Sequence, residues 1–387
     1  MCFRVFTNEE IVIAKEYKYS GTDDSLLVNY FLKYLWNTIV EYIPMTVAPN
    51  AITFAGFFLE VMSFTISFWV SKSMTHVLPM WCCVLNGLCT LLYQCLDNLD
   101  GKQARRTKTS SPMGQFFDHG CDAITGALEL AKVAMTLTMG CGMRTFYFIY
   151  FLGVGFYLTS WEEYSLGRFY LGYINGPDEG LFLLGWIQII IGFYPNTRKA
   201  FDNKYVDYLV IFLFFATILV IFINVIKQAY SDSEKMKKSI ISLFPAIISG
   251  GIFLAHYLVF DNVLSPYFIL SSGLLLQYSS QLIIVATLVK RRPFAIYHIS
   301  LVFLWIAALS PFVFPNFSSV FFWKVYFCTL ILIMVVQDVR VLHGFSVGLD
   351  IPVFSIKKHM STEHHETISS TSIAVTAADS SFAPLNE

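Results

Sequence analysis

Charged residues are scarce in this sequence. Only 14% of its 387 residues are Asp, Glu, Lys or Arg, whereas a soluble globular domain carries about a quarter. Hydrophobic residues make up 56% of the chain, and apolar stretches long enough to cross a lipid bilayer recur along its whole length. This composition excludes both a soluble protein and a protein with a single membrane anchor.

Other common features are also missing. The eight cysteines are scattered and show neither the spacing of a disulfide framework nor a CxxC metal motif. The formal net charge of −1 argues against a nucleic-acid partner. The N-terminus lacks the order of basic, apolar and small residues of a cleavable signal peptide. We therefore expect buried thiols, and a first spanning helix that itself serves as the targeting signal.

The hydropathy pattern predicts an all-α polytopic membrane protein with about ten transmembrane helices. An amphipathic interfacial helix at residues 23–43 precedes them, although an ordinary packed helix explains that pattern equally well. The predicted spans are residues 51–71, 77–97, 115–140, 145–165, 180–196, 206–226, 239–259, 266–289, 295–313 and 319–339. The predicted regions are a cytosolic N-terminus at 1–45, a transmembrane core at 46–200, further transmembrane helices at 201–343, and a disordered, Ser- and Thr-rich cytosolic tail at 344–387.

Lysine and arginine gather in the loops on one side of the predicted membrane. These loops are residues 98–114, 227–238 and 290–294, whereas the opposite loops carry fewer cations, apart from residues 198–204. Because positive charge favours cytosolic loops, this pattern places the turn between the second and third spans in the cytosol.

Four aspartates flank that turn. Asp97 and Asp100 lie at the end of one predicted helix, and Asp118 and Asp122 lie at the start of the next. Residues three and four positions apart share a helix face, so the antiparallel helices bring four carboxylates to one depth near the membrane surface. Small residues between them allow the helices, or a flat ligand, to approach closely; these are Gly101, Ala104 and Gly114.

Four carboxylates cannot share such a site without counter-charge, because repulsion and desolvation would force their protonation. An all-oxygen set suits a hard divalent cation, Mg²⁺ or Mn²⁺, and lacks the soft ligands of a zinc site. Two such ions roughly 3.5–4 Å apart would clamp a diphosphate and stabilise displacement at phosphorus. A single intramembrane Asp is commonly structural or part of an ion pathway, but four at helical spacing indicate phosphoryl transfer.

The same residues resemble a known motif. The stretch from Asp97 to Asp122 matches every fixed position of D-x2-D-G-x2-A-R-x8-G-x3-D-x3-D, the motif of the CDP-alcohol phosphotransferase family. The resemblance implies that the four aspartates bind two divalent ions and that residues 46–200 are the catalytic core. It also implies that Gly101, Ala104, Arg105 and Gly114 pack around the CDP moiety.

Further stretches look like the eukaryotic choline and ethanolamine phosphotransferase branch of that family: residues 48–53, 100–107, 117–122, 161–164 and 175–180. This resemblance implies transfer of phosphocholine or phosphoethanolamine from CDP-choline or CDP-ethanolamine to diacylglycerol. The products are then phosphatidylcholine or phosphatidylethanolamine and CMP. We expect an endoplasmic reticulum or Golgi membrane, and the charge pattern of the loops places the active site on its cytosolic face. We also expect a homodimer.

Two residues are candidates for the base that takes the proton of the acceptor hydroxyl. His119 borders the predicted metal site and belongs to the residue type that titrates near neutral pH. Asp122 is the second candidate, although a metal-bound carboxylate is a weak base. His119 is favoured, and its alternative role is to orient one of the aspartates.

Other candidates surround the donor. Asn50 stands at the cytosolic start of the first span, where it either reaches the CDP moiety or caps its helix. By resemblance, Glu179 faces the aminoalcohol cation. Trp161 and Tyr164 offer aromatic faces to the same cation, unless they belong to an interfacial aromatic belt.

Glu129 and Lys132 predict a self-neutralising intramembrane pair, whereas Glu60 has no assigned role. Two rival functions remain open. The first is a phosphatidylinositol or phosphatidylserine synthase that uses CDP-diacylglycerol, which the chain length and the stretches at 161–164 and 175–180 disfavour. The second is a divalent-cation transporter, which would bind its ions nearer the bilayer midplane.

Overall fold

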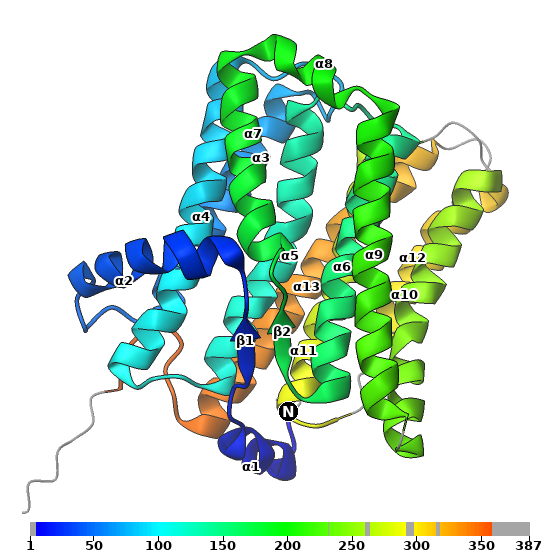
Figure 1. Ribbon diagram of the computed structural model, residues 1–387. Coiled ribbons are helices and arrows are strands. Elements are labelled where there is room, and N and C mark those ends of the chain that lie inside the picture. Colours follow the sequence, from blue (N-terminus) through cyan, green and yellow to red (C-terminus); the bar gives the residue numbers. More distant parts are fainter. Residues whose placement is uncertain (1–4, 231, 260–263, 292–297, 315–317, 358–387) are drawn as a thin grey trace, which may run out of the picture. The chain divides into compact units, whose positions relative to one another are not determined.

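The computed structural model describes residues 5–230, 232–259, 264–291, 298–314 and 318–357. Within these ranges the chain is mostly helical, with one two-stranded sheet (Figure 1). The long helices are α3 (Pro49–Val70), α4 (Met80–Thr107), α5 (Pro112–Thr136), α6 (Met143–Leu166), α7 (Leu181–Phe193), α9 (Lys204–Ala229), α10 (Ser233–Val259), α11 (Pro266–Leu288), α12 (His298–Val313) and α13 (Ser319–Leu349). The shorter elements are α1 (Asn8–Glu16), β1 (Gly21–Asp23), η1 (Val28–Leu32), α2 (Lys33–Tyr42), β2 (Phe169–Leu171), η2 (Gly176–Gly180), η3 (Pro195–Thr197) and α8 (Arg198–Phe201).

A described helix overlaps each predicted span, but only five helices in the described ranges are long and apolar enough to cross a membrane. These are α3, α9, the Met236–Val259 part of α10, α11 and α13. The helices α7 and α12 have only 13 and 16 residues. The helices α4, α5 and α6 carry polar and charged side chains within their length. The helical, membrane-embedded class is confirmed, whereas the predicted number of transmembrane helices is not.

The turn between α4 and α5 is defined by a C-terminal cap and an N-terminal cap. α4 ends where Lys108 adopts a left-handed conformation (φ 56°) and bonds back to α4 carbonyl groups. Ser111 then caps α5, because its side chain accepts a hydrogen bond from the N–H of Gly114, and Pro112 occupies the first helical position. Since α3 packs against both helices, side chains at this end of α3, α4 and α5 can meet.

The N-terminal region departs from the single helix predicted at residues 23–43. Residue Asp23 ends β1, which pairs in parallel with β2, and the helical segment formed by η1 and α2 starts later, at Val28. The sequence did not predict this sheet because the three residues of β1 are all exposed and show no apolar alternation.

The helix α2 lies across the direction of the long helices (Figure 1). Its last carbonyl groups, those of Val40 and Ile43, accept hydrogen bonds from Arg106 of α4. Tyr30, Phe31, Tyr34 and Tyr42 of the η1–α2 segment are exposed. Exposed aromatic side chains are what a helix at the membrane surface would present, and the interfacial position stays a prediction.

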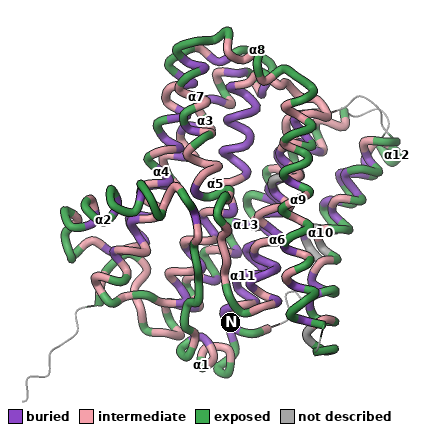
Figure 2. Tube along the Cα trace, viewed as in Figure 1, coloured by how far each residue is buried: buried purple, intermediate pink, exposed green. Residues whose placement is uncertain are grey.

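The helix α11 is the most buried of the candidate membrane helices. All of its apolar window is buried inside the protein, whereas α9 is largely exposed (Figure 2). It packs against α5, α6 and α13. At Gly273, a Cβ atom would lie only 2.7 Å from Ile149 of α6, so the close approach of these helices requires glycine at this position.

The helix α13 extends beyond the predicted start of the tail at residue 344. It continues to Leu349, because Gly344 and Gly348 pack against α1 and the residues before it. A Cβ atom at these glycines would lie 2.9 Å from Phe6 and 2.3 Å from Ile11. The predicted disordered tail therefore begins too early, and residues 358–387 lie outside the described residues.

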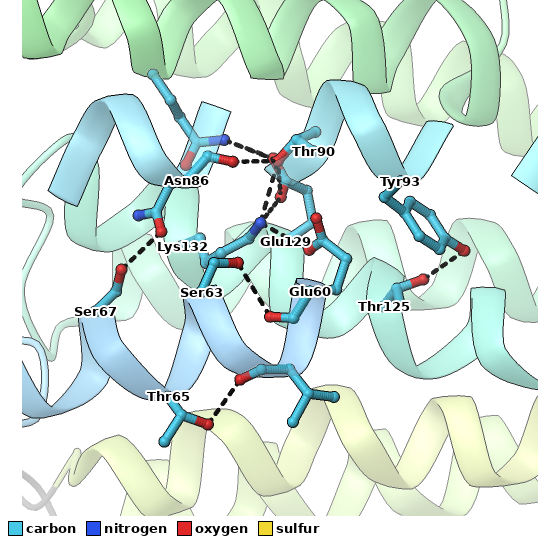
Figure 3. Close-up of polar contacts among 12 residues, drawn as sticks. Glu60, Ser63, Thr65, Ser67, Asn86, Thr90, Tyr93, Thr125, Glu129 and Lys132 are labelled. Carbon is cyan, nitrogen blue, oxygen red and sulfur yellow. Dashed lines mark hydrogen bonds and ion pairs between the residues drawn. The ribbon is translucent and has the colours of Figure 1, made fainter. Parts of the chain in front are cut away.

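A buried charge network connects α3, α4, α5 and α7 (Figure 3). Lys132 Nζ lies 2.8 Å from Glu129, which confirms the predicted pair, and 2.7 Å from Glu60, whose role the sequence left open. Thr90 and Gln188 donate to Glu129 at 2.7 Å each. Two carboxylates and one ammonium group thus tie four helices together.

Candidate active site

Three of the four predicted aspartates form a compact group. Carboxylate oxygens of Asp97, Asp100 and Asp118 lie within 4.8 Å of one another. One oxygen of Asp97 and one of Asp118 are buried and have no hydrogen-bond partner in the described part of the chain. Orphaned carboxylate oxygens at this spacing carry a large desolvation cost unless a cation compensates them. The donor set therefore fits a hard divalent ion.

Asp122 lies beside this group without belonging to it. It interacts electrostatically with Asp97, Asp100 and Asp118. Its Oδ1 accepts a hydrogen bond from the hydroxyl of Tyr93. This hydroxyl in turn accepts one from Thr125 at 2.8 Å (Figure 3). Neither Tyr93 nor Thr125 was among the predicted site residues, because a Tyr in an apolar helix resembles ordinary core packing.

The first turn of α3 closes one side of the aspartate group. Thr53 donates a hydrogen bond to Asp100. Asn50 is buried at 7% exposure, and its amide donates to the carbonyl of Val353 at 2.9 Å. The cap of α3 is Ala48 and has no side-chain hydrogen bond, so Asn50 does not cap this helix. Thr53 was missed because its partner lies on another helix.

The predicted CDP-binding residues lie where the helix faces leave room. A Cβ atom at Gly114 would lie 3.6 Å from Asn50 Oδ1, and one at Gly101 would lie 3.5 Å from the guanidinium of Arg105. Ala104 is half-buried on the same helix. The structure thus brings Asn50, Gly114 and Asp100 to one end of α3, α4 and α5.

His119 lies near two aromatic rings and an acid. Its ring centre is 5.0 Å from that of Phe169 and 6.1 Å from that of Tyr19. Glu163, at 3% exposure, interacts electrostatically with His119. Glu163 Oε1 accepts hydrogen bonds from Gln115 at 3.0 Å and from the Tyr17 hydroxyl at 3.5 Å.

Glu163 was not among the predicted site residues, although an acid in an apolar helix is a signal for a functional role. Burial, followed by the charge of Glu163, raises the pKa of Tyr17 to about 12. The phenol therefore stays protonated and remains a hydrogen-bond donor.

Comparison with known proteins identifies the family. The model of the CDP-alcohol phosphatidyltransferase family matches residues 46–163. Choline/ethanolaminephosphotransferase 1 of Arabidopsis thaliana is 34% identical over 272 residues, which are 65% of this chain and 69% of that protein. The chain belongs to the CDP-alcohol phosphatidyltransferase family.

Two further relatives match over shorter stretches. An uncharacterized CDP-alcohol phosphatidyltransferase class-I family protein of Dictyostelium discoideum is 40% identical over 198 residues, 51% of this chain and 50% of that protein. Choline/ethanolaminephosphotransferase 1 of Saccharomyces cerevisiae is 35% identical over 180 residues, 46% of each. The alignments thus span about half the length of these two relatives. Membership in the CDP-alcohol phosphatidyltransferase family, which the motif predicted, marks the chain as a phosphotransferase.

The acid predicted to face the aminoalcohol is engaged with the N-terminal segment. Glu179 accepts hydrogen bonds from Ser25 Oγ at 2.6 Å and from the N–H groups of Leu27 and Asn175 at 3.0 and 2.9 Å. Burial favours a higher pKa, but these hydrogen bonds outweigh it and hold the pKa of Glu179 below its ordinary value. A carboxylate with these partners anchors the segment before η1.

Asp178, the acid that precedes Glu179, is buried at 3% exposure. Burial first, and then the charge of Asp23, raise the pKa of Asp178 to about 7; Asp122 contributes as well. Gln94 of α4 donates to the carbonyl of Asp178 at 2.6 Å. Asp178 is therefore tied to α4 and interacts electrostatically with Asp122, which the sequence did not reveal.

Trp161 and Tyr164 do not join the aspartates through any contact among the described residues. Trp161 is buried, donates to the Ser239 carbonyl of α10 at 2.8 Å, and packs against Phe222 of α9. The Tyr164 hydroxyl donates to the Arg291 carbonyl at 3.4 Å. Both aromatic side chains connect α6 to neighbouring elements.

Proposed function

We propose that this phosphotransferase transfers phosphocholine or phosphoethanolamine from the matching CDP-aminoalcohol to diacylglycerol. The products are phosphatidylcholine or phosphatidylethanolamine and CMP. The observation that carries the proposal is the group of Asp97, Asp100 and Asp118, with its orphaned carboxylate oxygens at one end of three packed helices. The relatives named choline/ethanolaminephosphotransferase support the choice of substrates.

Asp97, Asp100, Asp118 and Asp122 would hold two divalent ions, Mg²⁺ or Mn²⁺. Bound there, the ions supply positive charge to the donor diphosphate and its leaving group. The protein contributes orientation: Thr53 fixes the carboxylate of Asp100, and Tyr93 fixes that of Asp122. We propose that Gly101, Ala104, Gly114, Asn50 and Arg105 pack around the CDP moiety.

His119 is the proposed base. It takes the proton of the diacylglycerol hydroxyl, and the hydroxyl oxygen attacks the β-phosphorus. The bond from this phosphorus to the bridging oxygen breaks, and CMP leaves with the electron pair. Glu163 interacts electrostatically with His119 and so places a buried carboxylate near the proton that His119 takes up. Asp122, whose Oδ1 is engaged by Tyr93, is less suited to this role.

For the aminoalcohol cation we propose Asp178 in place of Glu179. The Glu179 oxygens already accept three hydrogen bonds from the protein. Asp178 is buried, interacts electrostatically with Asp122, accepts a side-chain hydrogen bond from Asn175 at 2.9 Å, and lacks a cationic partner in the described ranges. The proposal leaves out aromatic roles for Trp161 and Tyr164, since Trp161 donates to α10 and Tyr164 donates to the segment after α11. The cytosolic orientation, the endoplasmic reticulum or Golgi membrane and the homodimer stay predictions.

The test uses purified protein in lipid nanodiscs containing diacylglycerol. We expect CDP-choline or CDP-ethanolamine to yield phospholipid and CMP, a chelator to abolish turnover, and Mg²⁺ or Mn²⁺ to restore it. CDP-diacylglycerol with inositol or serine should give no product. If CDP-diacylglycerol is the donor that supports turnover and the CDP-aminoalcohols are not, the protein is a synthase. Ion uptake without CMP release would indicate a transporter.

A further inference from the structure

The segment between α1 and η1 covers the side of the active site where His119 lies. The ring of Tyr19 meets that of His119 edge-on, at an interplanar angle of 84°. Phe169 of β2 contacts the same imidazole. Tyr19 also interacts electrostatically with Asp118, Glu163 and Arg105. One tyrosine on an N-terminal segment thus faces the proposed base, a metal-ligand candidate and the acid near that base.

Two anchors hold Tyr19 in this place. Before it, the hydroxyl of Tyr17 donates to Glu163. After it, the N–H of Phe169 donates to the Ser20 carbonyl at 2.9 Å, and the parallel register pairs Gly21 with Phe169. The segment is therefore fixed to α6 and β2 on both sides of Tyr19.

Gly21 gives Tyr19 its position. A Cβ atom at Gly21 would lie 2.2 Å from the Tyr19 hydroxyl oxygen and 2.4 Å from the adjacent ring carbon. The phenol ring therefore lies over the glycine, in space that any other side chain would take. Tyr19 is 51% exposed as a residue, so part of it packs against the site and part remains exposed.

We propose that Tyr19 determines acceptor specificity by covering His119 against water. This inference rests on the proposed function. A base that accepts a proton from a lipid hydroxyl can also accept one from water. Attack of water oxygen on the β-phosphorus would release the free phosphoaminoalcohol and CMP, with the water proton on His119. A half-exposed aromatic ring over the imidazole excludes bulk water, while the lipid hydroxyl enters from the bilayer.

The experiment compares Tyr19→Ala, Gly21→Val and Tyr19→Phe with wild type, using labelled CDP-choline and diacylglycerol in nanodiscs. The control is Tyr30→Ala, which alters an N-terminal tyrosine at 80% exposure. Free phosphocholine and phosphatidylcholine are measured separately. We expect the ratio of free phosphocholine to lipid product to rise about fivefold or more in Tyr19→Ala and Gly21→Val. It should stay at the wild-type value in Tyr19→Phe and Tyr30→Ala.

An unchanged ratio in folded Tyr19→Ala, or an equal loss of both products, would overturn the inference and leave the proposed function standing. If Tyr19→Ala does not fold, as judged by size-exclusion chromatography, Gly21→Val decides the question, because it displaces the ring without removing it. If wild-type protein makes no lipid product from either CDP-aminoalcohol, the proposed function fails and the inference fails with it.

Discussion

Asp178 and Glu179 are neighbouring acids with opposite environments. The pKa of Asp178 is raised to about 7 by burial and then by Asp23, so this carboxyl becomes charged as the pH rises through about 7. If the charged form binds the aminoalcohol, KM for CDP-choline should fall roughly tenfold per pH unit from below and level off above pH 7. Steady-state kinetics between pH 6 and 8 measure this slope.

The Asp178→Asn variant should raise KM at pH 8 and remove the pH dependence of KM. Glu179→Gln provides the contrast, because Glu179 anchors Ser25 and Leu27. Glu179→Gln should lower the thermal stability of the protein and leave the pH dependence of KM as in wild type. A pH slope that survives in Asp178→Asn contradicts the assignment.

Glu162 and Glu163 form a second matched pair, since consecutive residues point to different faces of a helix. Glu163 faces His119, whereas Glu162 accepts a hydrogen bond from Asn224 of α9 at 3.2 Å. We expect Glu163→Gln to lower kcat about 100-fold with little change in KM, the range of a lost acid–base contribution. Glu162→Gln should keep kcat within about threefold of wild type, because it changes one hydrogen bond away from His119. Equal loss in both variants would indicate a structural effect and contradict the role of Glu163.

Local helix geometry at the site could be predicted from the sequence, whereas contacts between helices could not. The pairs Asp97 with Asp100 and Asp118 with Asp122 could be predicted, because local helix periodicity and a short turn determine their direction. The partners Thr53, Tyr93 and Glu163 could not, because their contacts depend on how separate helices pack. Glu179 was assigned by resemblance, and its hydrogen bonds to Ser25 depend on the same long-range packing.

At the scale of elements, the Lys132 network joins α3, α4, α5 and α7. It lies further from the α4–α5 turn than the aspartate group does. The side chains of Lys132, Glu60 and Glu129 are at most 3% exposed. Removing the ammonium group in Lys132→Met leaves two buried carboxylates uncompensated, so we expect a loss of about 3–5 kcal/mol in unfolding free energy. Thermal unfolding in detergent reports this loss as a lower midpoint.

The triple variant Lys132→Met, Glu60→Gln and Glu129→Gln should recover most of that stability, because no unpaired charge remains. Lys227→Met, at an exposed position on α9, is the control and should leave the midpoint unchanged. If the single and triple variants unfold at the same temperature, the charges are not what joins these helices.

The helices themselves were easier to predict than their roles. Long apolar runs located α3, α9, α10, α11 and α13. The sequence did not predict α1, β1 or β2, since these short elements depend on contacts with α13 or with each other. Nor could the sequence join Glu60 to Lys132, which lies two helices further along the chain.

At the scale of the whole molecule, helix direction and charge make one prediction about orientation. The turns after α4 and after α9, and the end of α11, lie at the same end of the described helices (Figure 1). The last turns of α4 carry Lys102, Arg105 and Arg106, the last turn of α9 carries Lys227, and Lys290 and Arg291 follow α11. Positive charge favours the cytosolic side, so the aspartates at this end should face the cytosol.

Sealed microsomes, with their cytosolic face outward, test this orientation. CDP-choline is charged and does not cross the bilayer. Externally added donor should therefore be used at nearly the full rate, with less than about a twofold gain when detergent opens the vesicles. A lumenal marker enzyme, active only after detergent, proves that the vesicles are sealed. If transfer, like the marker enzyme, becomes active only after detergent is added, the site faces the lumen. The cations at this end of the molecule then do not determine its orientation.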